Sequence, residues 1–197
     1  MGVRRASNRQ RLYSLNKAGK TDTITSGAAA PLVTRQTTRR EGNKIVTEIA
    51  VNLGGNTSKS GGTDGDVIGK NLATTCTIAT LSLATHGYIT YAEIACVGAI
   101  AGGIADIDVK VGTANNDAQD SGVTGAQTLV ASGGSLTLGA RVASAITSIF
   151  DSGAPDSKAY LYLTNGDTAA AAVFTGGKLL ITLEGIASDA VPDTVSQ

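Results

Sequence analysis

The sequence predicts an all-β protein: an antiparallel β-sandwich with an extended basic arm at its N-terminus. Three observations support this prediction. From Ile45 onward, short segments rich in β-branched residues alternate apolar and polar side chains, separated by stretches of Gly, Asn and Ser, which is typical of sheets with one buried face. No segment has the apolar spacing of a long amphipathic helix. Basic residues are concentrated in the first 44 positions.

The first 44 residues are strongly basic and lack the apolar periodicity that a core requires. They contain ten of the 16 Lys and Arg residues and two acidic residues, a net charge of +8, whereas the rest of the chain carries −8. We therefore expect residues 1–44 to form an extended arm that orders against another surface. The candidate partner-binding residues of the arm are Arg4, Arg5, Arg9, Arg11, Lys17, Lys20, Arg35, Arg39, Arg40 and Lys44.

The first half of the remaining chain contains three expected strands. Residues 45–53 alternate with a period of two. Residues 54–62 are expected to be a loop, because Gly, Asn and Ser dominate them. Residues 73–83 are rich in β-branched side chains and predict a second strand, and residues 88–97 predict a third.

The second half opens with the clearest half-buried strand, residues 104–111, in which apolar side chains alternate with Asp106 and Asp108. A polar loop is expected at residues 115–125. Residues 143–150 fit either a short helix or a strand. The remaining expected strands are residues 127–130, 135–138, 160–164 and 178–185.

About eight short strands separated by turns favour a sandwich or a barrel, and a jelly roll fits their number and length best. We expect residues 45–186 to form the sandwich body and residues 187–197 to be a short C-terminal tail. The order of the strands does not follow from the sequence alone.

The composition points to a surface that is partly covered by partners. Charged residues make up 16% of the chain, against about 25% in an ordinary soluble domain, which favours a permanent oligomer or a lattice. The longest apolar-rich run, residues 94–107, is interrupted by glycines and is too short to span a bilayer, so we expect no membrane association. Cys76 and Cys96 fit two buried free thiols, or else a cross-strand disulfide.

The sequence offers little material for catalysis, and we expect a protein that is not an enzyme and holds no metal or cofactor. His86 is the only histidine, expected in a solvated or capping turn, and no Gly-x-Ser-x-Gly motif positions a nucleophile. Asp106 and Asp108 share one face of their strand, which would suit a cation or a catalytic pair, but a solvated strand face is the favoured interpretation. Asp64 and Asp66 lack the spacing of an EF-hand calcium loop.

The basic arm has three candidate roles. It could bind nucleic acid through counterion release, lie along an acidic protein surface, or be a disordered tail. Nucleic acid is disfavoured as a partner, because Tyr13 is the only aromatic residue of the arm and the cations are interleaved with Thr, Ala and Asn. An acidic protein surface, such as the negative body of a neighbouring copy, is favoured.

Two segments near the end of the chain have a distinctive order. Residues 160–168 read Tyr-Leu-Tyr-Leu-Thr-Asn-Gly-Asp-Thr, and after an Ala-rich run residues 174–185 read Phe-Thr-Gly-Gly-Lys-Leu-Leu-Ile-Thr-Leu-Glu-Gly. Together they resemble the closing hairpin of tailed-bacteriophage virion proteins, in which a strand ending in an Asn-Gly or Gly-Asp turn leads to a Gly-Lys-hydrophobic final strand. The resemblance implies a jelly-roll-like head protein, such as a cement or decoration protein that clamps the capsid lattice.

Together these features predict a structural virion protein that cements or decorates a bacteriophage capsid lattice. Its expected partners are the major capsid protein, whose neighbouring subunits the arm would bind, and copies of itself in a homotrimer. We expect it in the virion, after assembly in the host cytoplasm. The alternative is a tail- or fibre-associated sandwich that recognises a glycan or receptor. Because the chain has no Trp, the aromatic candidates for such a site are Tyr88, Tyr91, Tyr160 and Tyr162.

Overall fold

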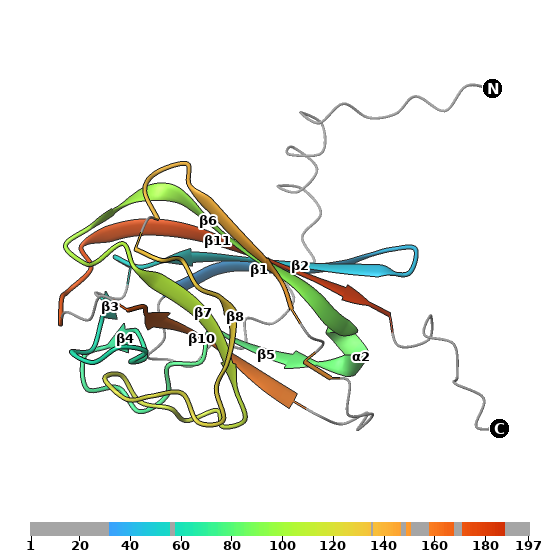
Figure 1. The fold of residues 1–197 in the computed structure, drawn as a ribbon, viewed down its shortest axis with the longest axis horizontal. Helices are drawn as coiled ribbons and strands as arrows, with labels where there is room; N and C mark the ends of the chain where they lie inside the picture. Colours follow the sequence, from blue (N-terminus) through green and yellow to red (C-terminus); the bar gives the residue numbers. More distant parts are fainter. Residues whose placement is uncertain are drawn as a thin grey trace.

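Two antiparallel sheets pack face to face in the computed structural model, which describes residues 32–55, 58–134, 136–146, 149–150, 158–167 and 171–187. In Figure 1 the five-stranded sheet is the upper layer and the four-stranded sheet the lower one. The elements are β1 (Leu32–Glu41), β2 (Lys44–Asn52), β3 (Ser58–Lys59), β4 (Gly69–Lys70), β5 (Ala79–Ser82), α2 (Leu83–His86), β6 (Tyr88–Ala101), β7 (Ile107–Gly112), β8 (Gln127–Val130), β9 (Arg141–Ala145), β10 (Lys158–Asn165) and β11 (Gly176–Ile186).

The strand order is that of a jelly roll. One layer has the order β1-β2-β11-β6-β9 and the other the order β5-β10-β7-β8. Most connections cross from one layer to the other, so strands that follow each other in the chain rarely pair, as in double Greek-key sandwiches. Strand β1 is added at the edge, beside β2. The predicted all-β antiparallel sandwich is confirmed.

The core between the layers is aliphatic, as the scarcity of aromatic residues requires. Ile49, Ile181 and Ile94 lie side by side on β2, β11 and β6, and all three are fully buried. Leu161 and Leu163 face them from β10 in the same cluster. Burial of such side chains contributes about 1.5–3 kcal/mol each, so these alternating inner positions supply most of the stability of the sandwich.

The sheet begins earlier in the chain than the sequence predicted. Residues 32–41, expected to belong to the arm, form β1 and pair antiparallel with β2. The strands are joined by Gly42 and Asn43, and Gly42 has a φ of +66°, as the first loop position of a type II′ hairpin requires. The expected boundary at residue 44 is therefore too late: Val33 and Gln36 are buried. Their spacing is obscured in the sequence by the Thr and Arg residues around them.

Two other expected elements differ from the structure, and one ambiguous segment is resolved. The strand expected at residues 73–83 is shortened to β5 by irregular backbone before Ala79. Residues 136–138 do not form the expected strand. The ambiguous segment at residues 143–150 begins in a strand, because β9 spans Arg141–Ala145.

The short helix α2 places His86 in the interior instead of at a solvated turn. Its side chain is 4% exposed, and Nδ1 accepts a hydrogen bond of 3.0 Å from the backbone N–H of Ser82. Of the two expected roles, a solvated turn or a cap, His86 therefore has the second: it binds the backbone N–H of Ser82, the N-cap residue of α2. Within the described residues, no helix is both long and apolar enough to cross a membrane.

Candidate functional site

The outer face of the five-stranded sheet carries three of the candidate arm residues that the structure describes, Arg35, Arg39 and Lys44. Strand pairing arranges its side chains in three rows across all five strands. Arginines stand on the edge strands β1 and β9, and glutamates stand on the three strands between them. The rows are Arg35, Ala50, Leu180, Ala95, Arg141; then Thr37, Glu48, Thr182, Glu93, Ala143; then Arg39, Val46, Glu184, Tyr91, Ala145.

At the β1 edge, one carboxylate serves two arginines. Oε2 of Glu48 lies 3.0 Å from Nη1 of Arg39 and 3.7 Å from Nη2 of Arg35. Nε of Arg39 also donates a hydrogen bond of 2.9 Å to Oε1 of Glu41. Burial lowers the pKa of Arg39, but the bond to Glu41 and the charge of Glu48 outweigh it and raise the pKa overall. This guanidinium is therefore held in place by acids of its own chain.

The β9 edge repeats the arrangement with one arginine. Nη1 of Arg141 lies 2.7 Å from Oε1 of Glu93 on β6, and the hydroxyl of Tyr91 donates to Oε2 of the same carboxylate over 3.2 Å. At the hairpin end, Lys44 Nζ lies 2.5 Å from Oε1 of Glu184. Each pair joins neighbouring strands, so the charges reinforce the register of the sheet.

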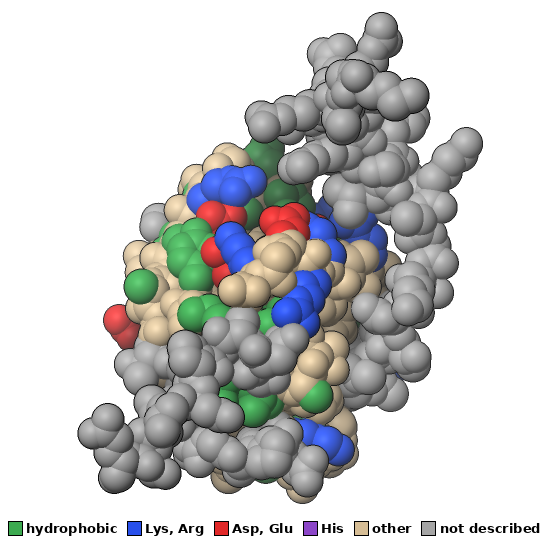
Figure 2. Space-filling view, turned by 90° about the vertical axis from the view of Figure 1, so that its right-hand side faces the viewer, with side chains coloured by type: hydrophobic (Ala, Val, Ile, Leu, Met, Phe, Trp, Pro, Cys, Tyr) green, Lys and Arg blue, Asp and Glu red, His purple; other side chains and the backbone are tan. Residues whose placement is uncertain are grey.

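The cations of this face are more exposed than the acids that hold them. The side chains of Arg35, Arg39 and Arg141 are 38%, 42% and 64% exposed, whereas those of Glu48 and Glu93 are 19% and 16% exposed. Figure 2, which looks at the right-hand side of Figure 1, shows basic and acidic side chains interleaved over the upper part of the molecule. A partner that approaches the sheet therefore meets guanidinium groups first, although nearby carboxylates balance their charge.

The structure places four of the ten predicted arm residues on the hairpin formed by β1 and β2. Arg35, Arg39 and Arg40 lie on β1, and Lys44 opens β2. Nε of Arg40 donates to the carbonyl oxygen of Gly42 over 2.8 Å. The other six, Arg4, Arg5, Arg9, Arg11, Lys17 and Lys20, lie outside the described residues.

Sequence reasoning missed the role of Arg141 and of the three glutamates in this surface. The available signal was the alternation of Glu48 and Glu184 with buried neighbours, which places each on an outer face. Nothing local in the sequence joins Arg141 to Glu93, because β9 and β6 pair across a crossover between the sheets.

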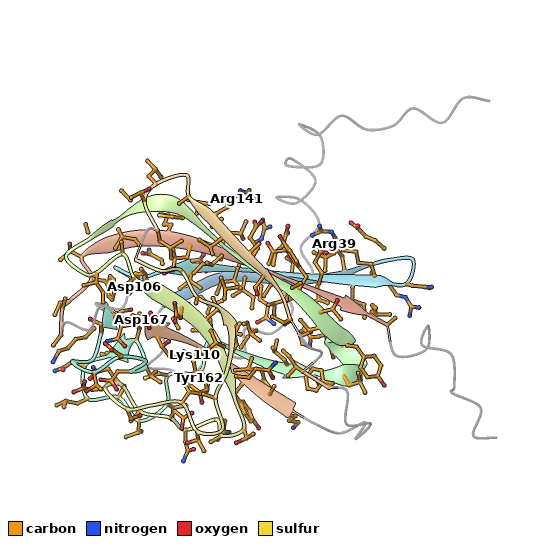
Figure 3. The ribbon with its side chains drawn as sticks, viewed as in Figure 1. Arg39, Asp106, Lys110, Arg141, Tyr162 and Asp167 are labelled. Carbon is orange, nitrogen blue, oxygen red and sulfur yellow. The ribbon has the colours of Figure 1, made fainter. Side chains whose placement is uncertain are left out.

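The outer face of the four-stranded sheet is covered instead of open. Two long loops lie over it, tied together by backbone hydrogen bonds from Val67 to Ser121 and from Gln119 to Ala73. The loop residues Val67 and Cys76 pack on Tyr162 of β10 in a second small apolar cluster. Figure 3 shows Tyr162, Lys110 and Asp106 on this side of the sandwich, away from Arg39 and Arg141.

Asp106 and Asp108 are buried here, which corrects the expectation of a solvated strand face. They are 3% and 6% exposed. Oδ1 of Asp106 accepts a bond from the N–H of Gly134, and Oδ1 of Asp108 accepts one from the N–H of Ser132, both 2.9 Å long. Burial raises the pKa of Asp108, and the Ser132 bond opposes that shift only in part. The carboxylates anchor the chain that follows β8.

Other aspartates fix the covering loops in the same way. Asp66 accepts a 2.7 Å bond from the N–H of Thr63 and Asp120 a 2.9 Å bond from the N–H of Gly62. Asp117 accepts bonds from both the N–H and the hydroxyl of Thr124. Among the residues that the structure describes, no group of three or more His, Cys, Asp or Glu side chains could hold a metal ion.

The buried Tyr162 completes the covered face. Its hydroxyl donates to the carbonyl oxygen of Ala114 over 2.6 Å and lies 2.9 Å from the hydroxyl of Thr77, which donates to it. Burial raises the pKa of Tyr162, and it raises the pKa of the neighbouring Cys76 to about 11. Cys76 and Cys96 are free thiols, so the disulfide alternative does not occur.

Comparisons with protein-family models, with curated proteins and with solved structures each found no match. The class of the protein is therefore the one that its own fold defines: an all-β sandwich with the strand order of a jelly roll. Its one open, charge-bearing sheet face is the candidate interaction surface within the described part of the chain.

Proposed function

We propose that the protein is a structural virion subunit that cements or decorates a bacteriophage capsid, with its basic N-terminal region binding neighbouring capsid subunits. The observation that carries the proposal is the attachment of this region to the sandwich. Strand β1 is an edge strand, and the 31 residues before it carry six Lys and Arg residues and one acidic residue. A rigid sandwich with a cationic extension from one edge suits a subunit that clamps an acidic protein lattice.

The structure changes which cations are available to that lattice. Arg35, Arg39 and Lys44 face carboxylates of their own chain. The electrostatic attraction to capsid subunits is therefore assigned mainly to the six cations before β1, with the hairpin as a fixed base. By the same argument, copies of the chain are proposed as further partners, because the sequence after residue 44 carries a negative net charge.

For the alternative, a glycan-binding or receptor-binding module, one of the four candidate tyrosines is not accessible to a ligand. Tyr162 is fully buried, and the hydroxyl of Tyr91 is engaged with Glu93. No feature of the described residues favours this alternative over the capsid role.

Co-sedimentation with purified capsids of a tailed bacteriophage tests the proposal. The full chain should sediment with the capsids at low salt, and raising the ionic strength to about 0.5 M should release it, because exposed charges are screened over less than about 8 Å there. A chain that starts at Leu32 keeps β1 and should fold but bind at least tenfold more weakly.

A matched control replaces the six cations before β1 with Gln and leaves the chain length unchanged. It should behave like the shortened chain. A full chain that stays in the supernatant with every capsid tested at low salt would rule the proposal out.

A further inference from the structure

We propose that the outer face of the five-stranded sheet binds residues 188–197 of a second copy of the chain, with Asp189 and Asp193 meeting the arginines at the two edges. This inference deepens the assembly role proposed above by naming the contact between copies. Its test needs no capsid, so the two proposals can fail separately.

The receiving surface is the row that runs from Arg35 to Arg141. Between the two arginines lie Ala50, Leu180 and Ala95, and none of the three carries a charge or a polar group. Ala50 and Leu180 are part-exposed and Ala95 is 2% exposed, so the part of the row that a partner can reach between the arginines is apolar. Four strand spacings separate the arginine Cα atoms, a span of about 19 Å. The row is thus an apolar strip with a cation at each end.

The arginines are already oriented for a carboxylate partner. Arg141 is bonded on one side to Glu93 over 2.7 Å, Arg35 lies 3.7 Å from Glu48, and both arginine side chains are more exposed than these acids. A guanidinium has five N–H donors in a fixed fork, so it can bind a second carboxylate while it keeps the first.

The segment 188–197 has the complementary pattern. Its sequence is Ser-Asp-Ala-Val-Pro-Asp-Thr-Val-Ser-Gln, so Asp189, Val191, Asp193 and Val195 occupy alternate positions. An extended chain places such positions on one face, with Asp189 and Asp193 about 13 Å apart. The Cα atoms of Arg35 and Arg141 are about 19 Å apart. If their side chains point toward each other, their guanidiniums can bind Asp189 and Asp193, and Val191 then lies over Leu180.

Chain length assigns the segment to a second copy. Strand β11 ends at Ile186, and the N–H of Ala187 is fixed to the carbonyl oxygen of Asn43. Ile186 lies about 20 Å along the strand from Leu180, while Asp189 can lie at most about 10 Å beyond Ile186. Asp189 therefore cannot reach Arg35 or Arg141 of its own chain, whereas Asp189 of another copy can.

Sedimentation velocity of the full chain over about 1 μM to 1 mM at low salt tests the contact by its concentration dependence. The wild type should associate. Both Asp189→Asn/Asp193→Asn and Arg35→Gln/Arg141→Gln should raise the dissociation constant at least tenfold. The charge exchange, with Arg35→Asp/Arg141→Asp and Asp189→Arg/Asp193→Arg in one chain, should restore at least half of the association. Lys70→Gln/Lys158→Gln is the matched control and should associate like the wild type.

Two results would overturn the inference: a wild type that remains monomeric up to the highest concentration, or an association that neither double variant weakens. The Asp189→Asn/Asp193→Asn variant changes no residue of the described sheets, so its result stands even if the arginine variant fails to fold. Loss of capsid binding with intact self-association would instead count against the capsid role alone.

Discussion

The two outer faces of the sandwich start from the same sequence pattern and end in different environments. On the five-stranded sheet, Glu48 and Glu93 pair with arginines at an open surface. On the four-stranded sheet, Asp106 and Asp108 alternate with apolar residues in the same way, but loops cover them. Alternation therefore shows which side chains point away from the core, and other parts of the chain decide whether water reaches them.

The difference has an energetic consequence. A polar group on the open face can exchange its protein partner for water, so its net contribution is small. A polar group under the loops has no such replacement, and losing its partner carries the full cost of desolvation. Matched substitutions on the two faces should therefore change the free energy of unfolding by different amounts.

The largest expected effect is that of Tyr162→Ala on the covered face. Removing this fully buried ring should cost about 3–5 kcal/mol in the free energy of unfolding, by analogy with other buried aromatic side chains. Urea denaturation followed by circular dichroism measures it. Tyr91→Ala on the open face is the control and should cost much less; equal losses would show that the open face is covered as well.

A medium effect is expected for Ser132→Ala. The hydroxyl of Ser132 accepts a 2.9 Å bond from the buried N–H of Ile107, and leaving such a donor without its partner costs about 1–3 kcal/mol. Ser144→Ala is an exposed comparison at the edge of the other sheet: its side chain points to the side of β9 opposite Ala143, its bond to the carbonyl oxygen of Ala145 lies at the surface, and its loss should leave the urea midpoint nearly unchanged. A loss from Ser144→Ala as large as that from Ser132→Ala would contradict the comparison.

Asp108→Asn should stabilise the protein at neutral pH. Burial raises the pKa of Asp108 in the folded state, so ionised Asp108 disfavours folding above that pKa, and its contribution to stability improves as pH falls. Asparagine removes the charge and can still accept the bond from Ser132. The melting temperature of the variant should exceed that of the wild type at pH 7, and the gain should shrink toward about pH 4. A gain that does not change with pH would exclude this cause.

The smallest effect is expected for Arg141→Ala, which breaks the exposed pair with Glu93. Such pairs contribute about 0–1 kcal/mol, and added salt should reduce even that difference. Urea denaturation at low and high salt measures both. A salt-independent loss above about 2 kcal/mol would mean that Glu93 is costly to leave unpaired, as under the loops of the other face.

The strands with regular alternation were predicted well from the sequence. Residues 127–130 match β8, and residues 45–53 and 178–185 fall close to β2 and β11. Strand β1 was missed because the arginines and threonines on it mask the two buried positions, Val33 and Gln36. Its membership of the sheet is decided by pairing with β2, not by its own hydrophobicity.

The candidate surface could be predicted only in part. The charge of the hairpin cations was evident, but their neutralisation by Glu48 and Glu184 depends on strand pairing. The buried aspartates were mistaken for solvated ones, because Asp106 and Asp108 bond to residues more than 20 positions away in the chain. Single-sequence periodicity carries no information about such distant loops.

The position of β11 has a consequence for how the protein comes to be folded. It lies between β2 and β6, yet it is the last of the described strands to leave the ribosome. Until β11 is synthesised, the sides of β2 and β6 that it joins have no pairing strand. Val46 of β2, for example, pairs with Glu184, which lies 138 positions later in the chain. Loop closure over such separations slows folding. We expect the five-stranded sheet to close only once β11 has been synthesised, in one late and cooperative step.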